Sequence, residues 1–234
     1  MAQDDGDELL RGERDRIDKV WLLKRLFEGY VRNYGALRCH RVGSGWADST
    51  QNEISQFAQL GLMLGYVPTR EHCEDREDHP RKTNQRDLCW LDVDNRRAGS
   101  RGRVFLHLER ETEREKALDT VNNPNNKLLE SASFADGRLL VGVFGWVTEK
   151  ELAAIRKAVE DQVQYEKAST LLIAWVSAKK DVLPENYSIR GLVYTDRRWH
   201  ERRAVAGLER GEEPGGSFWY LYFGADSRWG AQVP

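Results

Sequence analysis

The sequence predicts an α/β fold in which helices flank a central mixed β-sheet. Two observations support it. Helical and strand-like hydrophobic patterns alternate along the chain, and a turn-rich segment separates two short apolar runs near its middle. With 234 residues, the chain is long enough to bury a sizeable core. We expect one compact α/β domain with additions at both ends.

Two amphipathic helices are expected in the N-terminal part. Apolar residues recur at helical spacing across 15–33, and again across 49–64, where Ser49 or Thr50 would cap the helix. A glycine follows the second pattern and ends that helix. The next segment, 66–71, is expected to form a short strand.

A β-hairpin is predicted in the next part of the chain. An apolar run over 88–93 is entered at Asp87, and a glycine- and arginine-rich turn over 94–103 leads into a strand over 104–110. Strands joined in this way are antiparallel neighbours, so the start of one lies near the end of the other. The sequence therefore predicts that Asp87 and Glu109 are close in space.

Helices and strands continue to alternate through the middle of the chain. The segment after the hairpin is helical in pattern but is interrupted by an asparagine-rich stretch that contains a proline. A strand is expected over 139–144 and another over 169–176. Between them, a helix over 148–165 begins with a capping-box pattern formed by Thr148 and Glu151.

The character of the chain changes after its first three quarters. Strands are expected over 189–195 and 218–223, and the arginine- and glycine-rich stretch between them is assigned no element. The predicted organisation is an N-terminal helical extension (1–48), an α/β core (49–180) and a C-terminal β-rich extension packed on the core (181–234).

The charge balance excludes a simple polycation. The 36 basic and 38 acidic side chains give a formal net charge of −2. A local basic patch can still attract phosphate. Two arginine groups are candidate nucleic-acid contacts, with solvated surface as the default interpretation: Arg96, Arg97, Arg101 and Arg103, and Arg197, Arg198, Arg202 and Arg203.

Membrane insertion, disulfides and zinc are not expected. The acidic N-terminus lacks the apolar core of a signal peptide, and no segment approaches 18 uninterrupted apolar residues, so we expect a soluble, cytoplasmic protein. Three cysteines without a CxxC spacing favour reduced thiols. A zinc site is the weaker alternative for the following residues, which lack finger-like spacing: Cys39, His40, His72, Cys73 and His79.

The candidate site comprises three carboxylates. Glu109 and Glu111 are two residues apart on a predicted strand, so they share a face and project roughly 6 to 7 Å apart. With Asp87 they would offer hard oxygen ligands for Mg²⁺. The alternative is that Glu109 and Glu111 have no role in a site and belong to a strand that continues into a solvated, charged helix. His107 shares the face of Glu109, and a buried core histidine is its default interpretation.

These residues resemble the PD-(D/E)XK nuclease superfamily. The resemblance rests on the order of elements and on three local pieces: the helix that bears Glu53 and ends in LGY, Asp87 in QRDLCWLDVD, and Glu109 with Glu111 in VFLHLERE. It covers residues 49–177. It implies a restriction-endonuclease-like core and hydrolysis of nucleic-acid phosphodiesters with Mg²⁺ or Mn²⁺.

The resemblance also implies roles for individual residues. Asp87 and Glu109 would hold the metal. Glu111 stands where the family usually has a lysine, an E-x-E variant, and Lys127 is the candidate for a lysine supplied by the following helix. Glu111 would orient the attacking water or accept its proton. Two further acids are candidate outer partners: Glu53 and Glu71.

Two functions from different classes follow. The first is a metal-dependent endonuclease or phosphodiesterase that cleaves nucleic acid, with DNA favoured over RNA as substrate. The second is a non-catalytic nucleic-acid- or protein-binding module on the same fold. Trp199 and the aromatic residues of 218–223 either stack on bases or fill a core. No membrane partner is expected, and a homodimer is left open.

Overall fold

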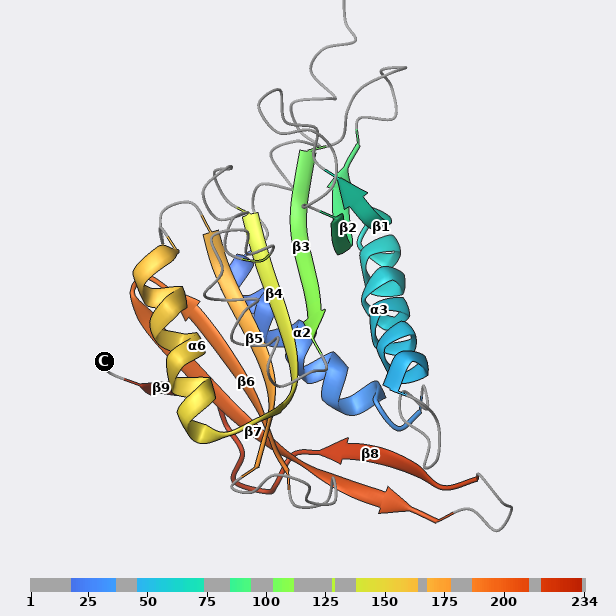
Figure 1. Cartoon of the computed structure of the whole chain (residues 1–234), viewed down its shortest axis with the longest axis vertical. Helices are drawn as coiled ribbons and strands as arrows, with labels where there is room; N and C mark the ends of the chain where they lie inside the picture. Colours follow the sequence, from blue (N-terminus) through green and yellow to red (C-terminus); the bar gives the residue numbers. More distant parts are fainter. Residues whose placement is uncertain are drawn as a thin grey trace, which may run out of the picture.

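The computed structural model describes residues 18–36, 46–73, 85–93, 103–111, 128, 138–163, 168–177, 187–210 and 216–232. Within these ranges, nine strands form one mixed sheet and three helices pack on it (Figure 1). No helix among these residues is both long enough and apolar enough to cross a membrane.

The strands follow one another across the sheet in the order of the chain, from β1 to β8, and β9 pairs with β7. Strands β1 to β3 form an antiparallel meander, β3 to β5 are parallel, and β5 to β8 are antiparallel again. Their bounds are β1 Val67–Cys73, β2 Gln85–Asp92, β3 Arg103–Glu111, β4 Arg138–Val147, β5 Ala168–Val176, β6 Ser188–Thr195, β7 Arg198–Glu209, β8 Phe218–Tyr222 and β9 Gly230–Gln232.

Helices cover both faces of the sheet. Helices α2 (Lys19–Asn33) and α3 (Trp46–Met63) pack on the face that carries Leu106 and Leu108, here called the α2/α3 face. Helix α6 (Glu149–Gln162) packs on the opposite face, which carries Leu140 and Phe144 and is called the α6 face. Figure 1 shows α6 in front of the sheet and α2 behind it.

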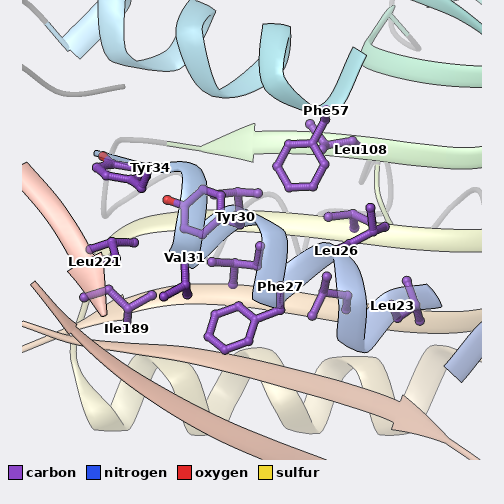
Figure 2. Packing of buried hydrophobic residues seen from close by; sticks show 14 of the residues in the cluster. Leu23, Leu26, Phe27, Tyr30, Val31, Tyr34, Phe57, Leu108, Ile189 and Leu221 are labelled. Carbon is purple, nitrogen blue, oxygen red and sulfur yellow. The ribbon is translucent and has the colours of Figure 1, made fainter. Parts of the chain in front are cut away.

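The larger core lies between the sheet and α2. Leucine and aromatic residues at helical spacing along α2 point into it, including Phe27 and Tyr30 (Figure 2). The ring of Phe27 lies directly over Gly191 of β6, where a Cβ atom would collide with it. The bare backbone at this position therefore lets α2 approach the sheet closely.

Most predicted elements are confirmed. The structure contains both strands of the predicted hairpin, the strands expected over 139–144 and 169–176, and the helix that Thr148 caps. The capping box between Thr148 and Glu151 is formed. The two N-terminal helices are also present, with α2 beginning at Lys19 and α3 at Trp46. The predicted cap of the second helix was wrong, because Ser49 and Thr50 lie inside α3. The predicted turn over 94–102 and most of the segment between β3 and β4 lie outside the described residues.

Two elements were missed, β7 and the three-residue strand β9. The arginine- and glycine-rich stretch that was assigned no element contains β7, the longest of the described strands at 12 residues. A two-residue turn, Asp196 and Arg197, joins it to β6, and both residues have positive φ, as a tight hairpin of right-twisted strands requires. The alternation of buried Trp199 and Glu201 with less buried neighbours was the available signal.

The three predicted segments are joined through one sheet, to which the first contributes a packed helix and the other two contribute strands. Helix α2, from the N-terminal segment, contacts β5, β6 and β8. Strands β6 to β8, from the C-terminal segment, continue the core sheet edge to edge. The C-terminal strands therefore extend the sheet and add no separate layer.

Candidate functional site

The register of the β2–β3 hairpin brings Asp87 next to Glu109. Leu88 pairs with Leu108 and Cys89 with His107, so the same register carried back by one residue sets Asp87 opposite Glu109. The Asp87 carboxylate accepts a hydrogen bond from the backbone N–H of Arg110, 2.7 Å from Oδ2. The predicted proximity of these two acids is confirmed.

Glu109 lies buried on the α6 face. Its Oε1 is 2.6 Å from Nε2 of His107, two residues earlier on the same strand, and His107 is also buried. Glu109 pairs across the parallel strands with Gly142, where an added Cβ would lie 3.0 Å from the side chain of Leu128. Leu128 therefore packs on the same face, beside the candidate site.

Glu111 ends β3 on the face that Glu109 occupies, because residues two apart on a strand share a face. Its side chain is half-buried, and its backbone carbonyl accepts a hydrogen bond from Nη1 of Arg110 at 2.8 Å. In the part of the chain that the structure describes, no three His, Cys, Asp or Glu side chains are grouped so that they could hold a metal ion together.

The opposite face of β3 carries a buried polar chain. The guanidinium of Arg110 forms an ion pair with Glu53 of α3, and both side chains are almost completely buried. Glu53 also accepts a hydrogen bond from the Tyr30 hydroxyl at 2.8 Å, and that hydroxyl accepts one from Trp175 Nε1 at 3.0 Å. Glu53 is thus joined to the site through Arg110 and lies on the other side of the sheet from Glu109.

The protonation states within this chain follow from burial and charge. Burial by itself would lower the pKa of Arg110, but the adjacent Glu53 outweighs this effect and the pKa is raised, so the guanidinium stays charged. Burial raises the pKa of Tyr30 well above its ordinary value, and the charge of Glu53 adds to that. The Tyr30 hydroxyl therefore stays protonated and donates to Glu53.

Sequence reasoning missed three members of this chain: Arg110, Tyr30 and Trp175. The sequence placed Arg110 at the end of the strand over 104–110 and gave its side chain no role. The available signal was strand alternation, because Leu106 and Leu108 are apolar and Arg110 continues their face into the interior. Nothing local in the sequence identifies its partner, which lies 57 residues earlier.

The arginines of the C-terminal segment lie far from the carboxylates. Arg197 and Arg198 are exposed at the β6–β7 turn, four strands from β3, which corresponds to roughly 19 Å at the usual strand spacing. Arg202 pairs with Glu28 at 2.6 Å, and its guanidinium lies 3.8 Å from the ring centre of Phe223. That contact anchors β7 to α2 on the α2/α3 face, so Arg202 takes part in core packing.

Several candidate site residues lie wholly or partly outside the described residues. Arg96, Arg97, Arg101 and Lys127 lie outside the described residues, as do Cys39, His40 and His79. The backbones of Glu71, His72 and Cys73 belong to β1, and their side chains are outside the described part.

Comparisons with protein-family models, with curated proteins and with solved structures find no match to this chain.

Proposed function

We propose that the protein is a metal-dependent phosphodiesterase that cleaves nucleic acid, with DNA favoured over RNA, on a restriction-endonuclease-like core. The observation that carries the proposal is the β2–β3 register, which sets Asp87 beside Glu109. Its setting adds support, because α3 and the strands β1 to β5 follow one another in the order on which the resemblance rests.

Two neighbouring carboxylates fit a Mg²⁺ or Mn²⁺ ion. Mg²⁺ is usually bound by one or two carboxylates, and water and substrate phosphate complete its shell, so Asp87 and Glu109 suffice. The burial of Glu109 adds to the fit, because a buried carboxylate is stabilised by a cation. When bound, the ion would supply Lewis acidity and lower the pKa of a coordinated water.

The remaining residues would position the reactants. Arg110 donates its backbone N–H to Asp87 and so orients that carboxylate, while His107 holds one oxygen of Glu109. Glu111, at the end of the same strand face, is proposed to orient the attacking water or to accept its proton. Lys127 is proposed to approach the phosphate.

The decisive experiment measures cleavage of single-stranded, double-stranded and branched DNA, and of RNA, in Mg²⁺ and in Mn²⁺. We expect wild-type cleavage that Asp87→Asn and Glu109→Gln abolish and that Asp161→Asn, at an exposed carboxylate on α6, leaves unchanged. Cleavage that survives both site substitutions would refute the site. Lys127→Ala tests the supplied lysine, which an unchanged rate would exclude.

The second candidate is a non-catalytic nucleic-acid- or protein-binding module. It is favoured by Glu111, which stands where a lysine would complete the catalytic set. Calorimetric titration with Mn²⁺ separates the two candidates. Binding that Glu109→Gln removes supports the enzyme. No binding of Mn²⁺ and no cleavage of any substrate would favour the module.

A further inference from the structure

We propose that the face of the β7–β8 ribbon that carries Tyr220 and Tyr222 binds single-stranded nucleic acid by stacking bases on these two rings. These two residues, with Val205 beside them, are called the tyrosine platform. The inference rests on the proposed function, because the strand bound here would be the substrate of the carboxylate site.

The structure separates the C-terminal aromatic residues into two groups by strand alternation. Trp219 and Leu221 are buried and belong to the core between the sheet and α2. Tyr220 and Tyr222 point to the opposite face and are 37% and 47% exposed. Val205, which pairs with Tyr222, is 38% exposed. Three apolar or aromatic side chains therefore lie together at the surface.

Helix α6 covers the neighbouring part of this face and stops short of the platform. Trp199 of β7 is buried, and its Nε1 donates to Glu160 of α6 at 2.5 Å. Further along the same face of β7, Arg203 and Val205 are exposed. Trp199 is therefore a core residue under α6, and the platform is the part of the face that the described helices leave uncovered.

The two tyrosine rings form a broad, fixed surface. Their centres are 5.7 Å apart and their planes are inclined by 31°. The ring of Tyr220 lies over Gly207 of the paired strand, where an added Cβ would be 2.5 Å from its Cζ. The ring thus occupies the space that a side chain at Gly207 would need. Rings that lie side by side on an antiparallel sheet are a known way to stack successive bases.

The platform shares a face with the carboxylates. Directly paired residues lie on the same face, and one row of pairs runs from Glu111 through β4, β5 and β6 to Arg203. The platform begins one step beyond Arg203 on this face. In Figure 1, β3 and β4 point towards the end of the molecule at which the β7–β8 ribbon extends outward. The five strand spacings from β3 to β8 correspond to roughly 24 Å.

The charges around the platform suit a phosphate on its inner side. Arg203 is 59% exposed, and its Nε contacts Glu201 at 2.7 Å. Glu201 is buried and also lies 3.8 Å from Arg190, so two arginines share one carboxylate. A phosphate can compete with such a partly exposed ion pair. The exposed Glu209 pairs with Phe218 at the outer end and disfavours phosphate there.

The test measures binding of a fluorescent 12-nucleotide oligothymidylate by anisotropy, in EDTA so that no cleavage occurs. We expect Tyr220→Ala and Tyr222→Ala each to weaken binding roughly 5- to 150-fold. Tyr220→Phe and Tyr222→Phe keep the rings and should bind as wild type does. Wild-type protein that fails to bind the oligonucleotide, or alanine variants that bind unchanged, would overturn the platform.

A glycine pair provides a second test that removes no tyrosine. Gly207→Ala puts a methyl group under the Tyr220 ring and should weaken binding by displacing it. Gly224→Ala is the matched control, because nothing lies within 4 Å of its added Cβ. Equal affinity of the two variants would contradict the proposed seating of the ring.

Failure of this inference can be told apart from failure of the proposed function. Tyrosine-dependent binding without any metal-dependent cleavage would leave the platform standing and refute the enzyme. Cleavage that depends on Asp87 and Glu109 but not on the tyrosines would do the reverse. The alternative ligand of the tyrosine platform is a second copy of the chain, which sedimentation velocity detects. If the wild type is a dimer and Tyr222→Ala dissociates it, the platform is a contact between copies and the inference is overturned.

Discussion

The two faces of strand β3 carry alternating charged residues in different settings. On the α2/α3 face, Arg110 meets Glu53 and Tyr30 in a buried chain that ties two helices to the sheet. On the α6 face, Glu109 meets an imidazole, and Asp87 lies beside it. The arginine side therefore stabilises the fold, whereas the acidic side brings two carboxylates together, where we propose that a divalent cation binds.

The largest expected effect is on the arginine side. Arg110→Met or Glu53→Met should each lower the free energy of unfolding by about 3 to 5 kcal/mol, because each leaves a buried charge without its partner. The double variant should lose much less, since two apolar side chains replace the pair. Urea denaturation followed by circular dichroism measures this. A loss in the double variant equal to the sum of the two single losses would show that Arg110 and Glu53 do not act as a pair.

Tyr30→Phe tests the next link of the same chain. It removes the hydroxyl between Glu53 and Trp175 and leaves two buried polar groups short of a partner, so we expect a loss of about 1 to 3 kcal/mol in the free energy of unfolding. The control is Tyr222→Phe, at an exposed tyrosine, which should change the unfolding free energy little. An equal loss in both variants would show that the buried Tyr30 hydroxyl contributes no more to the free energy of unfolding than the exposed Tyr222 hydroxyl does.

His107→Gln tests the acidic side. Residues that orient a metal-binding side chain typically affect metal affinity or activity 10- to 100-fold, and we expect a loss in this range for Mn²⁺ affinity measured by calorimetry. His200→Gln, at a half-buried histidine on β7, should leave the affinity unchanged. If His107→Gln lowers only stability and not Mn²⁺ affinity, then both faces of β3 are structural.

The smallest expected effect concerns Glu28, which pairs with Arg25 and Arg202 on the α2/α3 face. Burial alone would raise its pKa, but hydrogen bonds from Trp229 and Arg25 and the two nearby arginines lower it below the ordinary 4.5. A depressed pKa in the folded state stabilises the fold above pH 4.5, and this stabilisation is lost as pH falls through the folded pKa.

Unfolding of Glu28→Gln, measured from pH 7 down to pH 3, checks that sign. The wild type should lose its advantage over the variant on the acidic side of the range. An advantage that grows as the pH falls would show that burial, and not the arginines, dominates the pKa of Glu28.

The sequence predicted those parts of the fold that depend on near neighbours. The capping box at Thr148 involves two residues three apart, and the pairing of Asp87 with Glu109 involves two strands that follow one another in the chain. Strand β7 was missed because arginines interrupt its apolar pattern, and because its buried face changes along its length, from under α6 to against α2.

The α/β class, most elements and the proximity of Asp87 to Glu109 could be predicted from the sequence, because they follow from hydrophobic periodicity and from strands that are neighbours in the chain. Only the tertiary structure decided which charged and aromatic residues are buried. Arg110 is buried because α3 brings Glu53 to it, and Trp199 is covered where α6 reaches β7, while Tyr220 and Tyr222 lie beyond its reach. The physical reason is that burial depends on partners far away in the chain, which a single local pattern does not contain.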